Sequence, residues 1–156
     1  MNTAAYVIDT DVLSEVLLGD ATAIQFFESI QKEPHSRIFI SEVSRLELLS
    51  YQELTDELAA KLDELVACFD DVIRVDEAVA RQAATLRRMQ SPPGERCPTC
   101  GKRMGGKLRT PDSMIAATAL TEQAVLVTRN VKDYQHLVAH IALRIVDPYH
   151  VETAES

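Results

Sequence analysis

Short apolar strand-like runs alternate with helical segments along almost the whole chain, and this alternation constrains the fold more than any other feature. The residues that favour strands fall at 5–8, 37–40, 72–75, 124–128 and 141–146. Apolar residues at helical spacing predict helices at 12–18, 22–30, 41–52, 55–68, 77–89 and from 110 onward. Strands that alternate with helices are typical of an α/β sandwich with a mostly parallel sheet, and we predict that class of fold.

Local signals mark several helix ends. Gly19 follows the first helical run, Ser41 precedes the third, and Ser44 with Glu47 also has the spacing of a capping box. Thr110 is predicted to cap the last helix, which would carry Pro111 in its first turn and Asp112 just inside it.

The composition fits one folded domain. The chain has 156 residues, 46% of them hydrophobic, which is enough for a core and argues against disorder. The net charge of −8 argues against a protein that holds nucleic acid on one broad basic face. The acids are either solvated helix surfaces or, for a few of them, ligands of a divalent cation.

The chain ends and the cysteines bear on the compartment. The first residues lack a basic region of the signal-peptide kind, and no apolar stretch approaches the roughly 18 residues of a membrane span. The three cysteines are an odd number, and two of them lie in one Cys-x-x-Cys. We therefore expect a cytoplasmic protein with no contact to a membrane.

Several polar residues follow predicted strands or open a buried helix. Asp9 comes directly after the first strand, and Arg129, Asn130 and Asp133 follow the strand that ends at Thr128. Ligands in open parallel sheets bind beyond the carboxyl ends of the strands, so these side chains are expected at one edge of the sheet. Asp112, in the first turn of an Ala-rich helix, is expected there as well.

Each acid also has an ordinary structural interpretation. Asp9, Thr10 or Asp11 would merely cap the next helix, and Asp112 would complement the dipole of the helix it opens. Glu47 would lie on the surface of an amphipathic helix, and Asp133 would be a plain loop acid. The convergence of all four at one sheet edge favours a shared role.

Carboxylates gathered at one edge suit metal-assisted hydrolysis of phosphodiester bonds. Carboxylate oxygens bind Mg²⁺ or Mn²⁺ and leave water in the coordination shell, so the chemistry needs no histidine base. None of the four histidines stands beside the acids in a motif, and we interpret all of them as surface or structural residues: His35, His136, His140 and His150.

Four segments, in order, resemble the motifs of the PIN domain family. They are Tyr-Val-Ile-Asp9-Thr-Asp-Val-Leu-Ser-Glu, Ile40-Ser-Glu-Val-Ser-Arg-Leu-Glu47-Leu-Leu, Thr110-Pro-Asp112-Ser-Met-Ile-Ala-Ala-Thr-Ala-Leu and Leu126-Val-Thr-Arg-Asn130-Val-Lys-Asp133-Tyr. The chain looks most like toxins of the VapC and FitB types. The resemblance implies a three-layer α/β/α sandwich over residues 1–150 as a single domain. It also implies an endoribonuclease that depends on Mg²⁺ or Mn²⁺, an RNA substrate, a cognate antitoxin and a homodimer.

The resemblance assigns Asp9, Glu47 and Asp112 as the central acids of the metal site. In the family the fourth position is taken by the residue that matches either Asn130 or Asp133. We assign Asp133 as the fourth acid, with Thr128 and Asn130 as orienting groups. For Arg129 a contact to phosphate and a structural ion pair remain equal alternatives.

The chain departs from typical family members in an insert at about 91–108, which contains Cys97 and Cys100. The insert is also locally basic and could offer a positive surface just before Asp112, through Arg96, Lys102, Arg103, Lys107 and Arg109. The pair resembles one half of a zinc ribbon, but zinc normally needs four ligands. Three interpretations stay open: a Zn²⁺ site shared by two chains of a dimer, a redox-active pair, or an incidental loop. Cys68 is expected to be a buried core thiol, and residues 151–156 a disordered tail.

Two other functions remain open at this point. One is a PIN-like binding module that acts through a DNA-binding antitoxin without catalysis. The other is a nuclease of RNA processing that has no antitoxin. The presence of Asp9, Glu47, Asp112 and Asp133 favours catalysis over the binding module.

Overall fold

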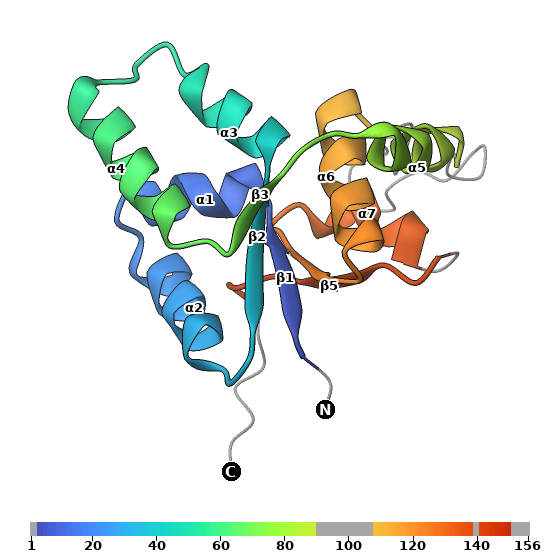
Figure 1. Ribbon diagram of the computed structural model, residues 1–156, viewed down its shortest axis with the longest axis horizontal. Helices are drawn as coiled ribbons and strands as arrows, with labels where there is room; N and C mark the ends of the chain where they lie inside the picture. Colours follow the sequence, from blue (N-terminus) through green and yellow to red (C-terminus); the bar gives the residue numbers. More distant parts are fainter. Residues whose placement is uncertain (1–2, 90–107, 139–140, 151–156) are drawn as a thin grey trace, which may run out of the picture.

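A computed structural model describes residues 3–89, 108–138 and 141–150 of the chain. Its strands form one sheet with the order β3-β2-β1-β4-β5, so the first strand of the chain lies at the centre (Figure 1). All neighbouring strands are parallel, which confirms the predicted class of fold. The strands are β1 (Ala5–Ile8), β2 (Arg37–Ser41), β3 (Asp71–Ile73), β4 (Val125–Val127) and β5 (Arg144–Val146).

Helices cover both faces of this sheet, as the three-layer prediction requires. The helices α1, α2 and α4 pack on one face, and α5, α6 and α7 pack on the other (Figure 1). The short helix α3 follows β2 and contacts both α1 and α6. The helices are α1 (Thr10–Leu17), α2 (Ala21–Lys32), α3 (Glu42–Leu49), α4 (Asp56–Ala67), α5 (Glu77–Arg88), α6 (Thr110–Thr121) and α7 (Val131–Val138).

The central strands are apolar on both sides because each side faces a helical layer. Successive strand residues point to opposite faces, so neighbouring strands in register build one row of side chains on each face. Each fully buried aliphatic or Phe side chain contributes about 1.5–3 kcal/mol to folding. The row toward α5 and α6 is Val7, Phe39 and Leu126, and the row toward α1 and α2 is Ile8, Ile40 and Val127.

One helix and several boundaries differ from the sequence prediction. The helix α7 was not predicted, because only eight residues separate the turn at Asn130 from its end. Its first turn carries Asp133, which is therefore not a loop acid. The first helix begins at Thr10 rather than at 12, and α3 ends at Leu49 rather than near 52. Shifts of this size are ordinary at fraying helix ends.

Two predicted caps and one predicted core residue are wrong. Arg109, not Thr110, is the N-cap of α6, and it makes no side-chain capping bond. Ser41 alone caps α3 through the amide of Val43, whereas Ser44 lies inside the helix. Cys68 is the C-cap of α4 and is exposed, because it lies outside the apolar stripe by which this helix packs on the core.

Part of the sequence prediction lies outside the described residues. Cys97 and Cys100, the insert up to residue 107 and the tail 151–156 all do so. The zinc, redox and loop interpretations of the cysteine pair therefore stay predictions. Within the three described ranges, no helix has both the length and the apolar character needed to cross a membrane.

Candidate metal and catalytic site

The carboxyl ends of β1 and β4 place Asp9 and Thr128 side by side. The strands pair Ile8 with Val127, and the Asp9 amide continues the ladder by donating to the Val127 carbonyl at 2.8 Å. The next residue along β4 is Thr128, whose buried hydroxyl donates to Asp9 Oδ2 at 2.8 Å. Residues 119 positions apart in sequence are thus joined by the sheet register.

Asp9 is a buried carboxylate with hydroxyl and amide partners. Only 4% of the residue is exposed, and its Oδ1 accepts from the Thr10 amide at 2.7 Å. Burial, and then the charge of Asp11, raise the pKa of Asp9 from 3.8 to about 7, although the Thr128 and Thr10 hydrogen bonds oppose the rise. The fold therefore holds Asp9 where its charge is costly unless a cation compensates it.

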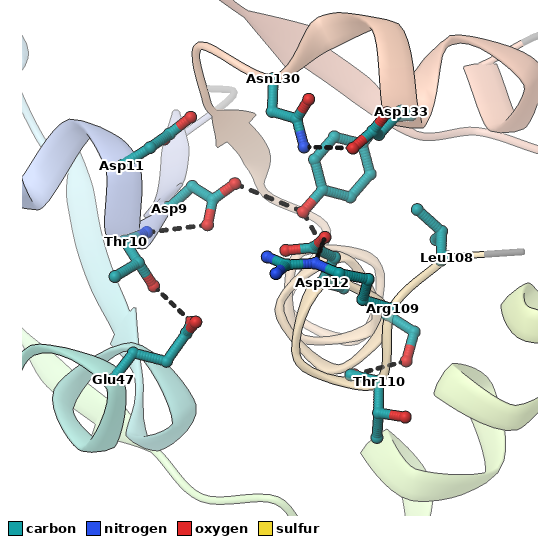
Figure 2. A network of polar contacts seen from close by, with 12 residues as sticks. Asp9, Thr10, Asp11, Glu47, Leu108, Arg109, Thr110, Asp112, Asn130 and Asp133 are labelled. Atoms are coloured by element: carbon teal, nitrogen blue, oxygen red, sulfur yellow. Dashed lines mark hydrogen bonds and ion pairs between the residues drawn. The ribbon is translucent and has the colours of Figure 1, made fainter. Parts of the chain in front are cut away.

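Asp112 reaches the same place from the opposite helical layer. It lies in the first turn of α6 and is 6% exposed. The buried Tyr134 hydroxyl lies 3.3 Å from Asp9 Oδ2 and 3.5 Å from the Asp112 carbonyl oxygen, so it spans the two residues (Figure 2). Burial and then the charges of Asp9 and Asp112 raise the pKa of Tyr134, which keeps its hydroxyl protonated as a donor.

Glu47 is held toward this space by Thr10. The Thr10 hydroxyl donates to Glu47 Oε1 at 2.8 Å (Figure 2). It also lies 3.0 Å from the buried Ser44 hydroxyl. A threonine has one hydroxyl proton and a carboxylate only accepts, so Ser44 supplies the proton between the two hydroxyls. Glu47 is therefore not the plain surface glutamate of the alternative interpretation.

Asp133 and Asn130 form a pair on the margin of the site. The Asn130 side-chain amide donates to Asp133 Oδ2 at 2.7 Å, and the Asn130 backbone amide donates to the Thr128 hydroxyl at 3.0 Å. Thr128 and Asn130 thus contact the acids that they were predicted to orient. Figure 2 shows Asp9, Glu47 and Asp112 around a common space with Asp133 beside it.

Asp11 is an acid of the site that the sequence prediction missed. Its Oδ2 accepts from the Arg129 amide at 3.1 Å, whereas its Oδ1 is buried and has no hydrogen-bond partner among the described residues. Burial raises the pKa of Asp11, although the hydrogen bond from the Arg129 amide opposes the rise. The one sign of this role in the sequence was that Asp11 stands two residues after Asp9. Asp11 was interpreted there only as a possible helix cap.

Arg129 is engaged in a structural ion pair. Its guanidinium donates to Glu15 at 3.0 Å and lies 4.3 Å from the centre of the Tyr149 ring. The Tyr149 hydroxyl in turn donates to Asp20 at 2.6 Å. These contacts fix the turn after β4, and they favour the structural alternative for this side chain.

Arg109 is a cation at the acids that the sequence prediction did not assign to the site. Its Nε donates to Asp112 Oδ2 at 3.2 Å (Figure 2). The pKa of the Arg109 guanidinium is raised by its hydrogen bond to Asp112 and by the charge of Asp112. The charges of Glu47 and Asp133 raise it further. The basic residues before Asp112 were noted in the sequence, but no signal there placed this one over the carboxylate.

The donor set suits a hard divalent cation, although the acids are engaged with neighbouring side chains. All the candidate ligands are carboxylate oxygens, the type that Mg²⁺ and Mn²⁺ prefer, and no described residue donates to Asp11 Oδ1. Within the described part of the chain, no three His, Cys, Asp or Glu side chains are arranged as a ready metal site. Metal binding by these acids therefore stays a prediction.

Solved structures share this fold. The chain resembles a structure from Rickettsia felis titled as VapBC2 bound to a promoter DNA fragment, at 19% identity and a TM-score of 0.68, over 92% of this chain and 98% of the other. A toxin–antitoxin complex from Klebsiella pneumoniae matches at 23% identity and 0.67, with the same coverage of 92% and 98%. FitAcB from Neisseria gonorrhoeae matches at 21% identity and 0.63, over 94% and 99%.

Sequence comparison identifies the family. A comparison with curated proteins gave no match. The PIN domain family, however, matches residues 6–140, which include every acid described above and nearly the whole of the chain. The motifs, the parallel sheet order and this match agree, and the chain belongs to the PIN domain family.

Proposed function

We propose that the chain is an endoribonuclease that hydrolyses RNA phosphodiester bonds with Mg²⁺ or Mn²⁺, and that it acts as the toxin of a toxin–antitoxin pair. The observation that carries the proposal is the burial of Asp9 beside Asp11 and Asp112, with a pKa raised to about 7. Three carboxylates so placed repel one another, and a divalent cation relieves that repulsion.

The chain's own residues would hold the cation and keep its ligands oriented. Asp9, Glu47 and Asp112 would be the central ligands, with Asp133 as the fourth acid. Thr128 and Tyr134 fix the Asp9 carboxylate, and Thr10 fixes Glu47. Such hydrogen bonds behind the ligands set their direction and their basicity.

A bound divalent cation supplies an activated water and neutralises charge on the phosphate and the leaving oxygen. With this water activated by the cation, the chemistry needs no histidine base. RNA, rather than a small ester, is the substrate that the PIN family and the toxin–antitoxin likeness support.

A cleavage assay tests the nuclease. Purified wild-type protein with Mg²⁺ and single-stranded RNA of mixed sequence should give products, and EDTA should stop the reaction. Asp9→Ala should show no cleavage while circular dichroism stays unchanged. Glu77→Ala removes an exposed acid outside the site, whose partner is Arg81, and should cleave like wild type. Equal inactivity of wild type and Asp9→Ala would favour the binding module instead.

An apolar pocket beside the acids supports a protein partner. It has a volume of about 530 Å³ and lies between α1, α4 and the residues after α3. Ser14, which lines it, stands one helical turn beyond Thr10 in α1, and its hydroxyl lies 3.1 Å from that of Tyr51, another lining residue. This end of the pocket therefore lies near the contact between Thr10 and Glu47. Leu18, another lining residue, is 73% exposed. An antitoxin segment seated here would extend toward the acids.

Growth in a bacterial host tests the toxin assignment. Expression of the wild type should arrest growth, and Asp9→Ala should not. Co-expression of a small protein encoded directly upstream should restore growth, and Leu18→Glu in the toxin should weaken that rescue. Growth arrest by Asp9→Ala as strong as that by the wild type would mean that toxicity does not depend on cleavage. This result would contradict this part of the proposal.

A further inference from the structure

Arg109 lies over the acidic site, and its contacts with the described residues include no structural task that would explain its position. It is the N-cap of α6, yet its side chain makes no capping bond to that helix. The side chain is 74% exposed, whereas the side chain of its partner Asp112 is 8% exposed. An exposed guanidinium on a flexible stem can leave this pair without opening the core.

The surroundings of Arg109 are the acids that a cation would also need. Its hydrogen bond reaches Asp112 Oδ2, and the charges of Glu47 and Asp133 act on it after that of Asp112. A guanidinium over these carboxylates compensates part of the negative charge that a divalent ion would also compensate. The two cations repel each other if both are present, so each weakens the binding of the other.

We propose that Arg109 is an internal counter-ion of the site, which holds Asp112 in the metal-free protein and gives way when the divalent cation binds. The proposal rests on the metal site of the proposed function. In the structure Asp112 offers Oδ2 to Arg109, an oxygen that a divalent cation would otherwise take.

The exchange has a measurable energetic consequence. Breaking the pair with Arg109 subtracts from the free energy of metal binding, and an ion pair with one exposed partner contributes about 1 kcal/mol or less. Removing the guanidinium should therefore tighten the binding of Mg²⁺ by up to about fivefold. Arg109→Lys keeps the charge but loses the Nε donor, so it should fall between the wild type and Arg109→Gln.

Isothermal titration of the full-length protein with Mg²⁺ measures this affinity for the wild type, Arg109→Gln, Arg109→Lys and a control. Arg81→Gln is the matched control, because Arg81 has the same charge and pairs with Glu77 on its own helix, where both side chains are more than three-quarters exposed. The control should bind Mg²⁺ as the wild type does. Circular dichroism of each variant verifies the fold.

The Nε resonance of Arg109 in nitrogen-15 NMR spectra follows the exchange itself. In metal-free protein this N–H should be protected by its bond to Asp112, and Mg²⁺ should remove the protection with the same midpoint as the titration. Equal Mg²⁺ affinity of wild type and Arg109→Gln, with an unchanged Arg109 signal at saturation, overturns the inference and leaves the metal site standing. Failure of every variant to bind Mg²⁺ overturns both.

Discussion

The raised pKa of Asp9 makes the stability of the metal-free fold depend on pH. The pKa of the folded Asp9 is about 7, above 3.8, so the metal-free folded state binds this proton more tightly than the unfolded chain does. The resulting stabilisation is complete below about pH 4 and is lost as the pH rises through about 7. Ionised Asp9 therefore destabilises the metal-free fold at neutral pH.

Asp9→Asn should remove this pH dependence. In EDTA at about pH 8 the variant should be more stable than the wild type by at least about 1 kcal/mol, and the difference should shrink toward about pH 5. Denaturant unfolding across this range measures it. Asp63→Asn, an exposed acid on α4, is the control and should follow the wild type. Parallel pH profiles of wild type and Asp9→Asn would contradict the assignment.

Thr10 is a positioning residue, because it holds Glu47 rather than a substrate. Thr10→Val keeps the shape but leaves Glu47 without this donor, and RNA cleavage should fall by about 10- to 100-fold. Thr10→Ser keeps the hydroxyl and should restore most of the rate. Initial rates at saturating Mg²⁺ measure both variants. Loss of activity in Thr10→Ser as large as in Thr10→Val would point to packing instead of the hydrogen bond.

At the residue scale the sequence predicted acids better than it predicted their supports. The sequence singled out Asp9 because motif and strand position coincide, and Glu47 and Asp112 because of their motifs; their binding of a metal stays a prediction. Thr10 and Tyr134 were missed, since their contacts join positions that only the folded sheet brings together. Asp11 and Arg109 were missed because their ordinary interpretations, a cap and a surface base, were sufficient in sequence.

Among the elements, α6 determines the position of Asp112. Its middle is buried on nearly every side, with Ala116, Ala117 and Ala119 fully inaccessible between α5 and the sheet. Small side chains at these places let the helix approach the sheet closely, and this brings its first turn to the end of β1.

Ala116→Leu should therefore destabilise the fold and displace the site. The added volume in a filled core costs about 1–3 kcal/mol in the free energy of unfolding. Ala60→Leu, at an exposed position of α4, is the matched control and should change stability by less than about 0.5 kcal/mol. Urea unfolding measures both. Equal stability of the two variants would mean that α6 does not pack as tightly as described.

The prediction of helices and strands succeeded where the apolar periodicity is strong and failed where an element is too short to show a period. The stripe of α4 and the alternation of strands and helices were evident in sequence, and Gly19 was a correct stop signal because it has a φ of 85° just after α1. The eight residues of α7 are too few for a clear period. The α6 N-cap was misassigned because Thr110 is a better capping residue than Arg109 in isolation.

For the whole molecule, the arrangement of the sheet explains how an acidic chain could carry out the proposed phosphodiester chemistry. A net charge of −8 repels RNA in general. The parallel order with β1 at the centre nevertheless concentrates Asp9, Thr128 and their neighbours at one edge, where α3 and α6 bring Glu47 and Asp112. A cation bound there reverses the local charge at the place where a phosphate must approach.

Diffraction from crystals soaked in Mn²⁺ tests this account most directly, because the anomalous signal locates the ion. The account predicts a peak at about 2.2 Å from carboxylate oxygens of both Asp9 and Asp112, with the Arg109 guanidinium moved off Asp112. A saturating soak that leaves these two carboxylates without a peak, or that places Mn²⁺ only elsewhere on the chain, would contradict it.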